Sequence, residues 1–311
     1  MRLILLTALT MIAFAANSVL NRWGVGPGHI GAVEFALIRL LAGAVTLAGL
    51  VLWLRGGWAW PGRRGRVSGV LGLASYLIGF SLAYRGLDAG TGALVLFGTV
   101  QVTMFAGALM SREPVPGRRW AGAALALGGL ALIAVPGKAG LGAEGLGPMA
   151  LMAVAGLGWG VYSLAGRGAA DPLAATAWNF LLAVPLVLPL AVLGLHGPDA
   201  KGIALAAMSG AVTSGLGYAV WYAVLPQLGA ARAAVAQLTV PVIAALGGAV
   251  LLAEAPGGRF WLAAARRTPR RSTRWWRPSW GFRVGAGPDS CPGSWPPAVA
   301  VQARLGGKKL P

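Results

Sequence analysis

The feature of this sequence that most constrains its fold is a succession of long apolar segments separated by short polar breaks. A helix needs about 17 to 25 apolar residues to cross a bilayer, and it can do so because it bonds its own backbone groups. Only 11% of the residues are charged and 57% are hydrophobic. We therefore predict an all-α polytopic membrane protein with nine recognisable transmembrane helices, over residues 3–20, 31–54, 67–84, 89–110, 119–136, 147–165, 172–193, 202–224 and 230–253.

The distribution of arginine and lysine among the short loops predicts the orientation. Loops rich in basic residues stay in the cytoplasm. A cytoplasmic N-terminus places ten basic residues inside, namely Arg2, Arg55, Arg63, Arg64, Arg66, Arg112, Arg118, Arg119, Arg167 and Arg232. It places five outside, namely Arg22, Arg85, Lys138, Lys201 and Arg259. We expect a multi-pass protein of the cell inner membrane with its N-terminus in the cytoplasm.

The chain contains an internal repeat at an offset of 141 residues. GALMSREPVPGRRWAGAA (107–124) aligns with GAVLLAEAPGGRFWLAAA (248–265), and eight of 18 positions are identical, including a Glu, an Arg and a Trp. The repeat divides the chain into residues 1–140, with five predicted spans, and residues 141–265, with four recognisable spans of the five that a full copy would hold. Because five is an odd number, the second copy enters the membrane in the opposite sense. Secondary transporters built in this way bind their substrate near mid-membrane between the halves.

Motifs in both halves carry a family resemblance. They are FAANSVLNRWG (14–24), FALIRLLAG (35–43), LGWGVYSLAGRG (157–168), NFLLAVPL (179–186), LTVPVIAALGGAVLLAE (238–254) and the Glu113/Glu254 pair. Together, over about residues 3 to 265, they resemble the EamA domain of the drug/metabolite transporter superfamily. The resemblance implies ten transmembrane helices in two inverted five-helix halves, both termini in the cytoplasm, and movement of small metabolites by alternating access, often outward.

Two features depart from the pattern of that family. The helix-four proline, present in the second half as Pro241, is replaced by Val100 in the first. The expected tenth helix is missing, because Arg266 follows Ala265 where the repeat partner continues as an apolar run. Residues 266–311 hold ten of the 26 basic residues. We predict that this Arg/Pro/Trp-rich tail is disordered and is a frameshift product.

Alternatives to that interpretation remain open. The tail could be native and bind anionic lipid or nucleic acid, or the chain could be a transport-inactive truncated paralogue. A native tail meets one objection, because nine spans would place its basic residues outside.

Arg39 is the one ionisable residue well within a predicted span. Such residues cost about 2.5 to 3.5 kcal/mol on insertion scales and are functional candidates for that reason. The functional interpretation is an anchor for a carboxylate or another anion, which the planar guanidinium can bind with two bonds. The structural interpretation is that Arg39 bonds helix-end carbonyls or pairs with Glu34. Both stay open at this stage.

Other polar and amphipathic residues are candidates for lining a cavity. Asn17 and Asn21 are four residues apart and share one helix face, although bonding between helices is an alternative role. Trp221 and Tyr222 are better explained as interfacial anchors, and Glu113 and Glu254 as helix caps or markers of topology. The predicted substrate-binding set is Arg39, Asn17, Asn21, Gln101, Trp159, Tyr162, Asn179, Tyr218 and Gln237.

Residue types that support catalysis are scarce in this sequence. Its two histidines, His29 and His196, fall in predicted loops, and its one cysteine is Cys291 in the tail. We therefore predict no enzyme, no metal site and no cofactor. Because no Asp or Glu lies well within a span, exchange or facilitated efflux fits as well as proton coupling. The expected function is export of a small metabolite such as an amino acid, with an anionic or zwitterionic substrate, no nucleic-acid partner, and an assembly compatible with a homodimer.

Overall fold

The computed structural model describes residues 1–63, 65–112, 143–167, 169–193 and 197–255, together with the isolated helical positions 117, 120, 124 and 128. Within this part of the chain every regular element is a helix. Seven of the described helices are long and apolar enough to cross a membrane, which supports the prediction of an all-helical, multi-pass membrane protein. Nearly all of the predicted span 119–136, and the whole tail 266–311, lie outside the described residues.

Six helices follow the predicted spans within a few residues. They are α1 (Arg2–Val25), α2 (Ala32–Arg55), α3 (Arg66–Ala83), α4 (Ala89–Met110), α6 (Ala143–Ala165) and α7 (Pro172–Leu193). The agreement has a physical reason, since the length of an apolar run and the Gly, Pro or charge at its ends are local properties of the sequence.

The last part of the described chain differs from the predicted spans 202–224 and 230–253. Helix continues from α8 (Ala200–Met208) through the π-helical η1 (Ser209–Leu216) into α9 (Gly217–Gln237). The break comes later than predicted, and α10 (Val240–Leu252) follows it. Pro241 lies in the first turn of α10, the place where a helix tolerates a proline because no backbone donor is needed there.

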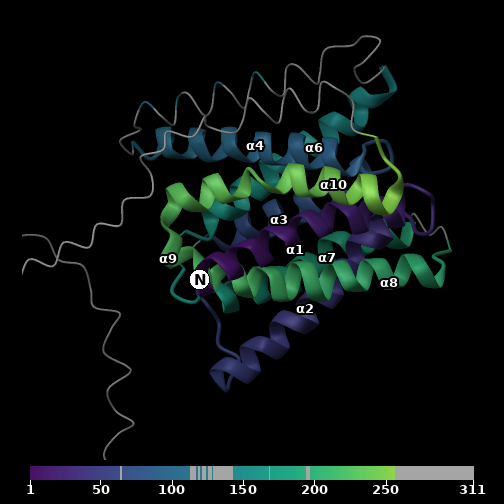
Figure 1. Ribbon diagram of the computed structural model, residues 1–311. Coiled ribbons are helices and arrows are strands. Elements are labelled where there is room, and N and C mark those ends of the chain that lie inside the picture. The colour runs from purple at the N-terminus through teal and green to yellow at the C-terminus, as the bar shows by residue number, and fades with distance from the viewer. Residues whose placement is uncertain are drawn as a thin grey trace, which may run out of the picture. The chain divides into compact units, whose positions relative to one another are not determined.

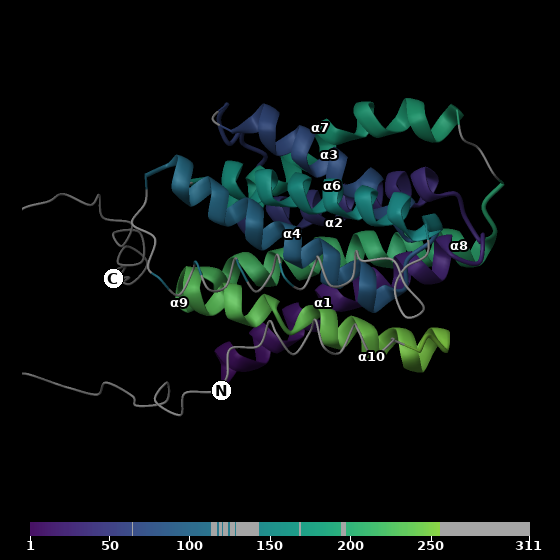
Figure 2. The same ribbon diagram turned by 90° about the horizontal axis from the view of Figure 1, so that it is seen from above.

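The helices pack through small residues. The α3–α6 and α2–α7 pairs share the largest interfaces, and Figure 2 shows α3 and α7 on one side of the bundle with α1 and α10 on the other. A Cβ atom on Gly72 of α3 would lie 2.7 Å from the Gly158 carbonyl oxygen of α6, and one on Gly158 would lie 2.6 Å from that of Gly72. Any larger residue would force the two helices apart, as expected where lipid does not drive association.

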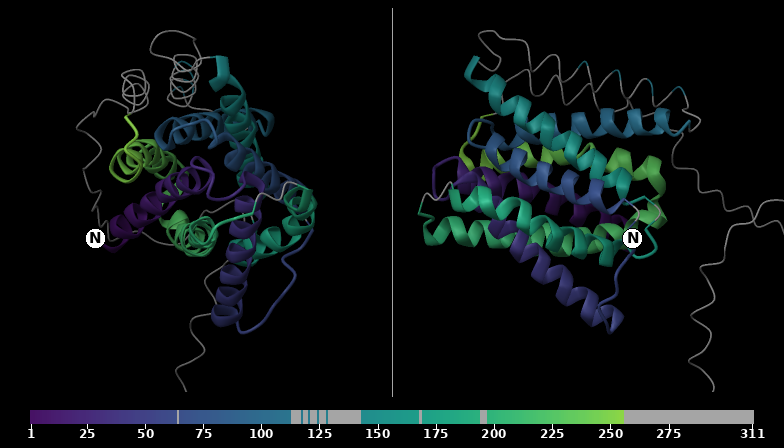
Figure 3. Two further views of the ribbon diagram at one scale, coloured as in Figure 1. Left: turned by 90° about the vertical axis from the view of Figure 1, so that its right-hand side faces the viewer. Right: turned by 180° about the vertical axis from the view of Figure 1, so that it is seen from behind.

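The C-terminal half of α2 projects to one side of the bundle (Figures 1 and 3), while its Leu47 and Val51 side chains stay buried. Its side chains Leu52, Trp53 and Leu54 are between 51% and 79% exposed. Such a hydrophobic surface is suited to contact with lipid.

Two helix ends share an uncommon backbone conformation at the offset of the sequence repeat. Among the described residues, Arg112 and Ala253 are the non-glycine positions with positive φ, at 53° and 54°. Each follows the end of a helix, α4 and α10 respectively, and they are 141 residues apart in the sequence. Positive φ is uncommon outside glycine, and here it occurs twice at the spacing of the sequence repeat.

Candidate functional site

A small cavity lies inside the bundle at the junction of α1, α3, α4, α6 and α9. Its volume is about 20 Å³, and a cavity needs roughly 10 to 15 Å³ to hold one water molecule. This conformation is therefore closed around a space too small for a metabolite. The lining residues are Phe14, Asn17, Ser18, Tyr76, Phe80, Leu96, Phe97, Trp159 and Tyr218.

Aromatic rings form most of the cavity wall. The Trp159 ring centroid lies 4.9 Å from that of Tyr76, 5.2 Å from that of Tyr162 and 5.2 Å from that of Tyr218. Phe14 meets the Tyr218 ring edge to face at 5.8 Å. The structure thus brings together Trp159, Tyr218 and Asn17 of the predicted set. Their part in substrate binding stays a prediction.

Arg39 is fully buried behind this wall. Its Nε donates to Ser214 Oγ at 3.1 Å, and its Nη2 donates to Tyr76 Oη at 2.7 Å. The guanidinium carbon lies 5.1 Å from the ring centroids of both Tyr76 and Phe80. Nη1 has no hydrogen-bond partner among the described residues. Both bonds go to neutral hydroxyl groups on other helices, a pattern that neither sequence interpretation anticipated.

The two asparagines of α1 join that helix to its neighbours. Asn17 Oδ1 accepts from Ser209 Oγ at 2.5 Å, and Asn17 Nδ2 lies 3.5 Å from Tyr76 Oη. Asn21 Nδ2 donates to Ser81 Oγ at 2.9 Å. Both asparagines therefore make bonds between helices, and Asn17 lines the cavity as well.

Ser209 and Ser214 belong to the site but were missed by sequence reasoning. Ser209 donates to Asn17, and Ser214 accepts from Arg39. Both serines are fully buried in η1. The signal that could have found them is SGAVTSGL, a run of small and hydroxyl residues inside an apolar span. π-helical turns of this kind occur frequently at functional sites.

A second polar cluster joins α6, α7 and α9. Tyr162 Oη lies 3.0 Å from Thr176 Oγ1 and 3.3 Å from Tyr222 Oη, and the last two atoms are 3.1 Å apart. Tyr162 is buried, and it stacks on Trp159. Tyr222, explained from sequence as an interfacial anchor, instead supplies a hydroxyl to this hydroxyl cluster (Tyr162, Thr176 and Tyr222).

Three predicted site residues lie away from the cavity. Asn179 Oδ1 accepts from Arg66 Nη1 at 2.6 Å, and the same nitrogen donates to the Ala175 carbonyl at 2.8 Å. Gln101 and Gln237 are half-buried on α4 and at the end of α9, and neither is among the lining residues. A substrate-binding role for these three remains a prediction that this conformation does not support.

The two ends of the bundle differ in chemistry. We call them the Arg22 end, where α1 ends and α2, α4 and α8 begin, and the Arg55 end, where α2 ends and α3 and α7 begin. In the predicted orientation the Arg22 end faces outward.

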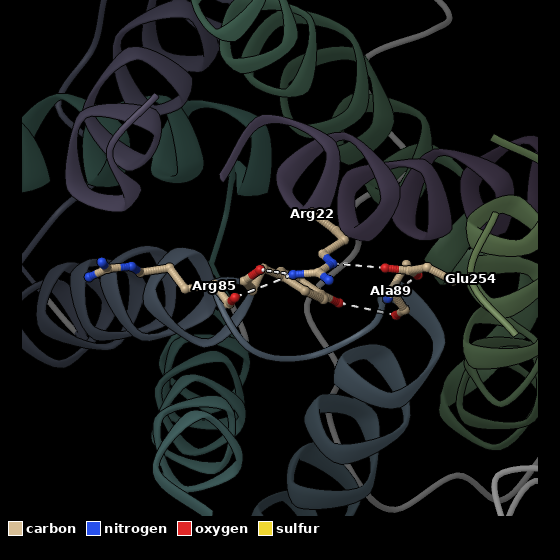
Figure 4. A network of polar contacts seen from close by, with 5 residues as sticks. Arg22, Arg85, Ala89 and Glu254 are labelled. Carbon is tan, nitrogen blue, oxygen red and sulfur yellow. Dashed lines mark hydrogen bonds and ion pairs between the residues drawn. The ribbon is translucent and has the colours of Figure 1, made fainter. Parts of the chain in front are cut away.

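An ionic clamp closes the Arg22 end (Figure 4). Arg22 Nε lies 2.8 Å from Glu254 Oε1, while Arg22 Nη1 donates to the carbonyls of Tyr84 and Arg85 at 3.0 and 3.4 Å. Glu254 Oε2 accepts from the Ala89 backbone N–H at 2.8 Å. The carboxylate therefore sits at the positive N-terminus of α4, where a negative charge is stabilised. Glu254 is a cap, as the sequence suggested, but for α4 and not for its own helix.

A glycine makes room for the clamp. A Cβ atom on Gly248 would lie 2.6 Å from Glu254 Oε2. A larger residue at position 248 would therefore displace the carboxylate.

Acidic side chains tie neighbouring loops together at both ends. At the Arg22 end, Asp199 begins α8 and lies 2.7 Å from His29 Nδ1. The backbone N–H of Gly202 and the His29 ring lower the pKa of the Asp199 carboxyl. At the Arg55 end, burial alone would raise the pKa of Asp171, but hydrogen bonds from Arg55 and from the Ala174 N–H outweigh it, and the pKa is lowered. These contacts hold the loops between the spans.

Metal-binding clusters are absent from the described residues, where no group of three or more His, Cys, Asp or Glu side chains could hold an ion. The arrangement offers a buried cation, amide and hydroxyl groups and aromatic rings around a cavity. Such a site suits reversible binding of a small solute.

Comparison with known proteins places these features in context. The sequence profile of the EamA-like transporter family matches residues 1–135 and again residues 147–265. The second match ends at the residue where the internal repeat ends, and the frameshift hypothesis for the tail stays a prediction.

Two individual proteins are similar to the chain. The uncharacterized protein PA1977 of Pseudomonas aeruginosa is 49% identical over 256 residues, which cover 81% of this chain and 87% of that protein. A protein of known crystal structure shares the fold with a TM-score of 0.63 and 18% identity, over 86% of this chain and 94% of the other.

Proposed function

The chain belongs to the EamA-like transporter family, and on that premise we propose that it is a secondary transporter of the inner membrane that exports a small organic metabolite by alternating access. The single observation that carries this proposal is the place of the cavity. Its lining comes from α1, α3 and α4 of the first repeat and from α6 and α9 of the second. Sites between two repeats are where transporters of this plan hold their substrate.

The internal organisation supports alternation between two inverted halves. The family profile matches twice in succession. The two described non-glycine residues with positive φ, Arg112 and Ala253, are separated by the 141 residues of the sequence repeat. We propose domains 1–140 and 141–265 on this basis, with five spans in the first and four recognisable spans in the second. The tail falls outside both.

The closed ends support an occluded intermediate. The ionic clamp joins α1, the α3–α4 turn and the segment after α10 at the Arg22 end, and the hydroxyl cluster joins α6, α7 and α9 nearer the Arg55 end. We propose that a solute reaches the cavity when one of these sets of contacts separates. Alternating access requires that the two sets open in turn.

The cavity walls suit a small molecule with polar and apolar parts. Asn17 and the tyrosine hydroxyls offer donors and acceptors, the rings offer stacking surface, and Arg39 places a positive charge behind them. We propose Asn17, Trp159 and Tyr218 as contacts for the solute, with Arg39 as the charged group of the site.

A transport assay tests the proposal. The full chain is reconstituted into liposomes loaded with a mixture of amino acids and organic acids, and the solutes released are identified by mass spectrometry. We expect release of at least one class above protein-free liposomes. Arg39→Ala should abolish this release while the variant still inserts, whereas Arg2→Gln, which removes an exposed helical arginine, should retain it. Release equal to that of protein-free liposomes for every solute would contradict the proposed function.

A further inference from the structure

The carboxylates that the structure describes all lie at the ends of the bundle. Three of them face a basic side chain, in the pairs Arg22–Glu254, His29–Asp199 and Arg55–Asp171. Glu34 folds back against Gly31 in the first turn of α2, and Asp88 is exposed before α4. In this part of the chain no carboxylate lies within ion-pair distance of Arg39.

Arg39 is therefore a buried cation held by neutral groups. It is 0% exposed, its two bonds go to the hydroxyls of Ser214 and Tyr76, and its Nη1 has no partner in the part of the chain that the structure describes. A buried charge is costly unless it is paired, and hydroxyl groups compensate it only in part. The fork of a guanidinium matches a carboxylate with two parallel bonds. An anion is the partner that this site lacks.

The described residues that line the cavity in front of Arg39 include no carboxylate that could pair with a positive charge. None of its nine lining residues is acidic, and six of them are aromatic. An ammonium group entering this space would meet the unpaired charge of Arg39 without a carboxylate to offset it. The rings suit a flat, apolar body.

Resting on the proposed function, we propose that the solute is a net organic anion, with a carboxylate that pairs with Arg39 and an aromatic or apolar body that fills the ring-lined cavity. Arg39 alone points to an anionic or a zwitterionic solute, and the lining favours the anion, because the ammonium group of an amino acid would find no carboxylate among the described lining residues. In the closed conformation Tyr76 occupies Nη2 and stands between Arg39 and the cavity. Binding therefore requires the Tyr76 side chain to move aside.

Three probes that share a phenylethyl group test the charge requirement. They are 3-phenylpropionate, an anion, phenylalanine, a zwitterion, and 2-phenylethylamine, a cation. Binding to the purified full chain is measured as the rise in unfolding temperature with ligand concentration, since a ligand that binds only the folded state stabilises it. We expect 3-phenylpropionate to bind at least ten-fold more tightly than the other two.

Variants locate the charge that is responsible. Arg39→Gln should remove the preference for the anion, Arg39→Lys should keep part of it because the charge remains without the fork, and Arg2→Gln should leave it unchanged. Each variant is first shown to be monodisperse and to unfold cooperatively. The comparison among the three probes on the unaltered chain does not depend on any variant.

The possible outcomes separate this inference from the proposed function. Equal or tighter binding of phenylalanine or phenylethylamine overturns the anion inference, and so does binding of none of the three probes. Release of some other solute in the liposome assay would leave the transport function standing in either case. An anion preference that survives Arg39→Gln would overturn the assignment of Arg39.

Discussion

The Arg22 end and the Arg55 end of the bundle are closed by different chemistry. At the Arg22 end an arginine and a glutamate bind each other and backbone groups at the start of α4. Toward the Arg55 end the buried contact is a set of neutral hydroxyls, and the Arg55–Asp171 ion pair is more exposed, at 53% and 29%.

The internal repeat makes this difference instructive. The repeat partner of Arg22 is Ser163, whose hydroxyl bonds the Trp159 carbonyl of its own helix. Glu254 has a glutamate partner, Glu113, which lies outside the described residues. At this repeat position the first half therefore has an arginine and the second half has a serine. Charge-assisted hydrogen bonds are roughly twice as strong as neutral ones, so we expect the Arg22 end to resist opening more than the Arg55 end.

Removing the clamp should produce the largest effect. Glu254→Gln leaves Arg22 without its counter-charge in a site where the two side chains are 24% and 10% exposed. Such a partly buried pair lies between the exposed and buried limits, so the closed state should lose about 1 to 3 kcal/mol. The measurement is the rate at which a membrane-impermeant maleimide, added from the Arg22 side, labels Leu96→Cys in a Cys291→Ser background. We expect faster labelling.

Arg85→Gln is the matched control. Arg22 binds only the backbone carbonyl of Arg85, and the Arg85 side chain points away from the clamp (Figure 4), so the substitution should leave the clamp intact. Labelling that stays slow in Glu254→Gln would show that the clamp does not keep this end closed.

Gly248→Ala should give a smaller change of the same kind. The added Cβ would lie 2.6 Å from Glu254 Oε2, so the carboxylate must shift and its bonds to Arg22 and Ala89 weaken. If the effect acts through Glu254, it should largely disappear in the Glu254→Gln background. Full additivity of the two substitutions in the labelling assay would assign the effect to helix packing instead.

Tyr162→Phe tests the hydroxyl cluster. The substitution removes one hydroxyl from a set of three and should cost about 0.5 to 1.5 kcal/mol, less than loss of the clamp. Leu96→Cys should then be labelled faster from the Arg55 side and at an unchanged rate from the Arg22 side. Equal acceleration from both sides would mean that the substitution loosens the whole bundle.

Acid should destabilise the loops only slightly. The folded pKa values of Asp171 and Asp199 lie below the ordinary value of 3.8. A depressed folded pKa contributes stability that is present above the unfolded pKa and is lost as pH falls through the folded one. The unfolding temperature should therefore drop below about pH 3.8, and less steeply in Asp171→Asn and Asp199→Asn. If both variants and the unaltered chain gave the same pH profile, protonation of these two carboxyl groups would not be the cause of the lost stability.

Sequence reasoning anticipated six helices within a few residues but misplaced the break before α10. The length of an apolar run predicts a span, whereas the end of α9 depends on how far that helix can continue before Pro241 starts another one. The same reasoning named three of the nine cavity-lining residues, Asn17, Trp159 and Tyr218. It also selected Asn179, whose partner Arg66 lies 113 positions earlier in the chain.

The coding DNA around residue 265 would sharpen the interpretation of the tail. A shifted reading frame that encodes about 15 to 20 apolar residues would support the frameshift hypothesis. A continuous open frame without such a segment in the other frames would instead identify the basic tail as native.

The class of fold was determined by the sequence alone, because a bilayer demands long apolar helices and that demand is met segment by segment. The identity of polar partners was decided only by the tertiary structure. Arg39 meets Ser214 across 175 residues of chain, and Arg22 meets Glu254 across 232. Which side chains meet depends on the rotation and crossing of whole helices. Small residues set those crossings, and this chain has 49 glycines. So many candidate contact points do not specify one helix arrangement from the sequence.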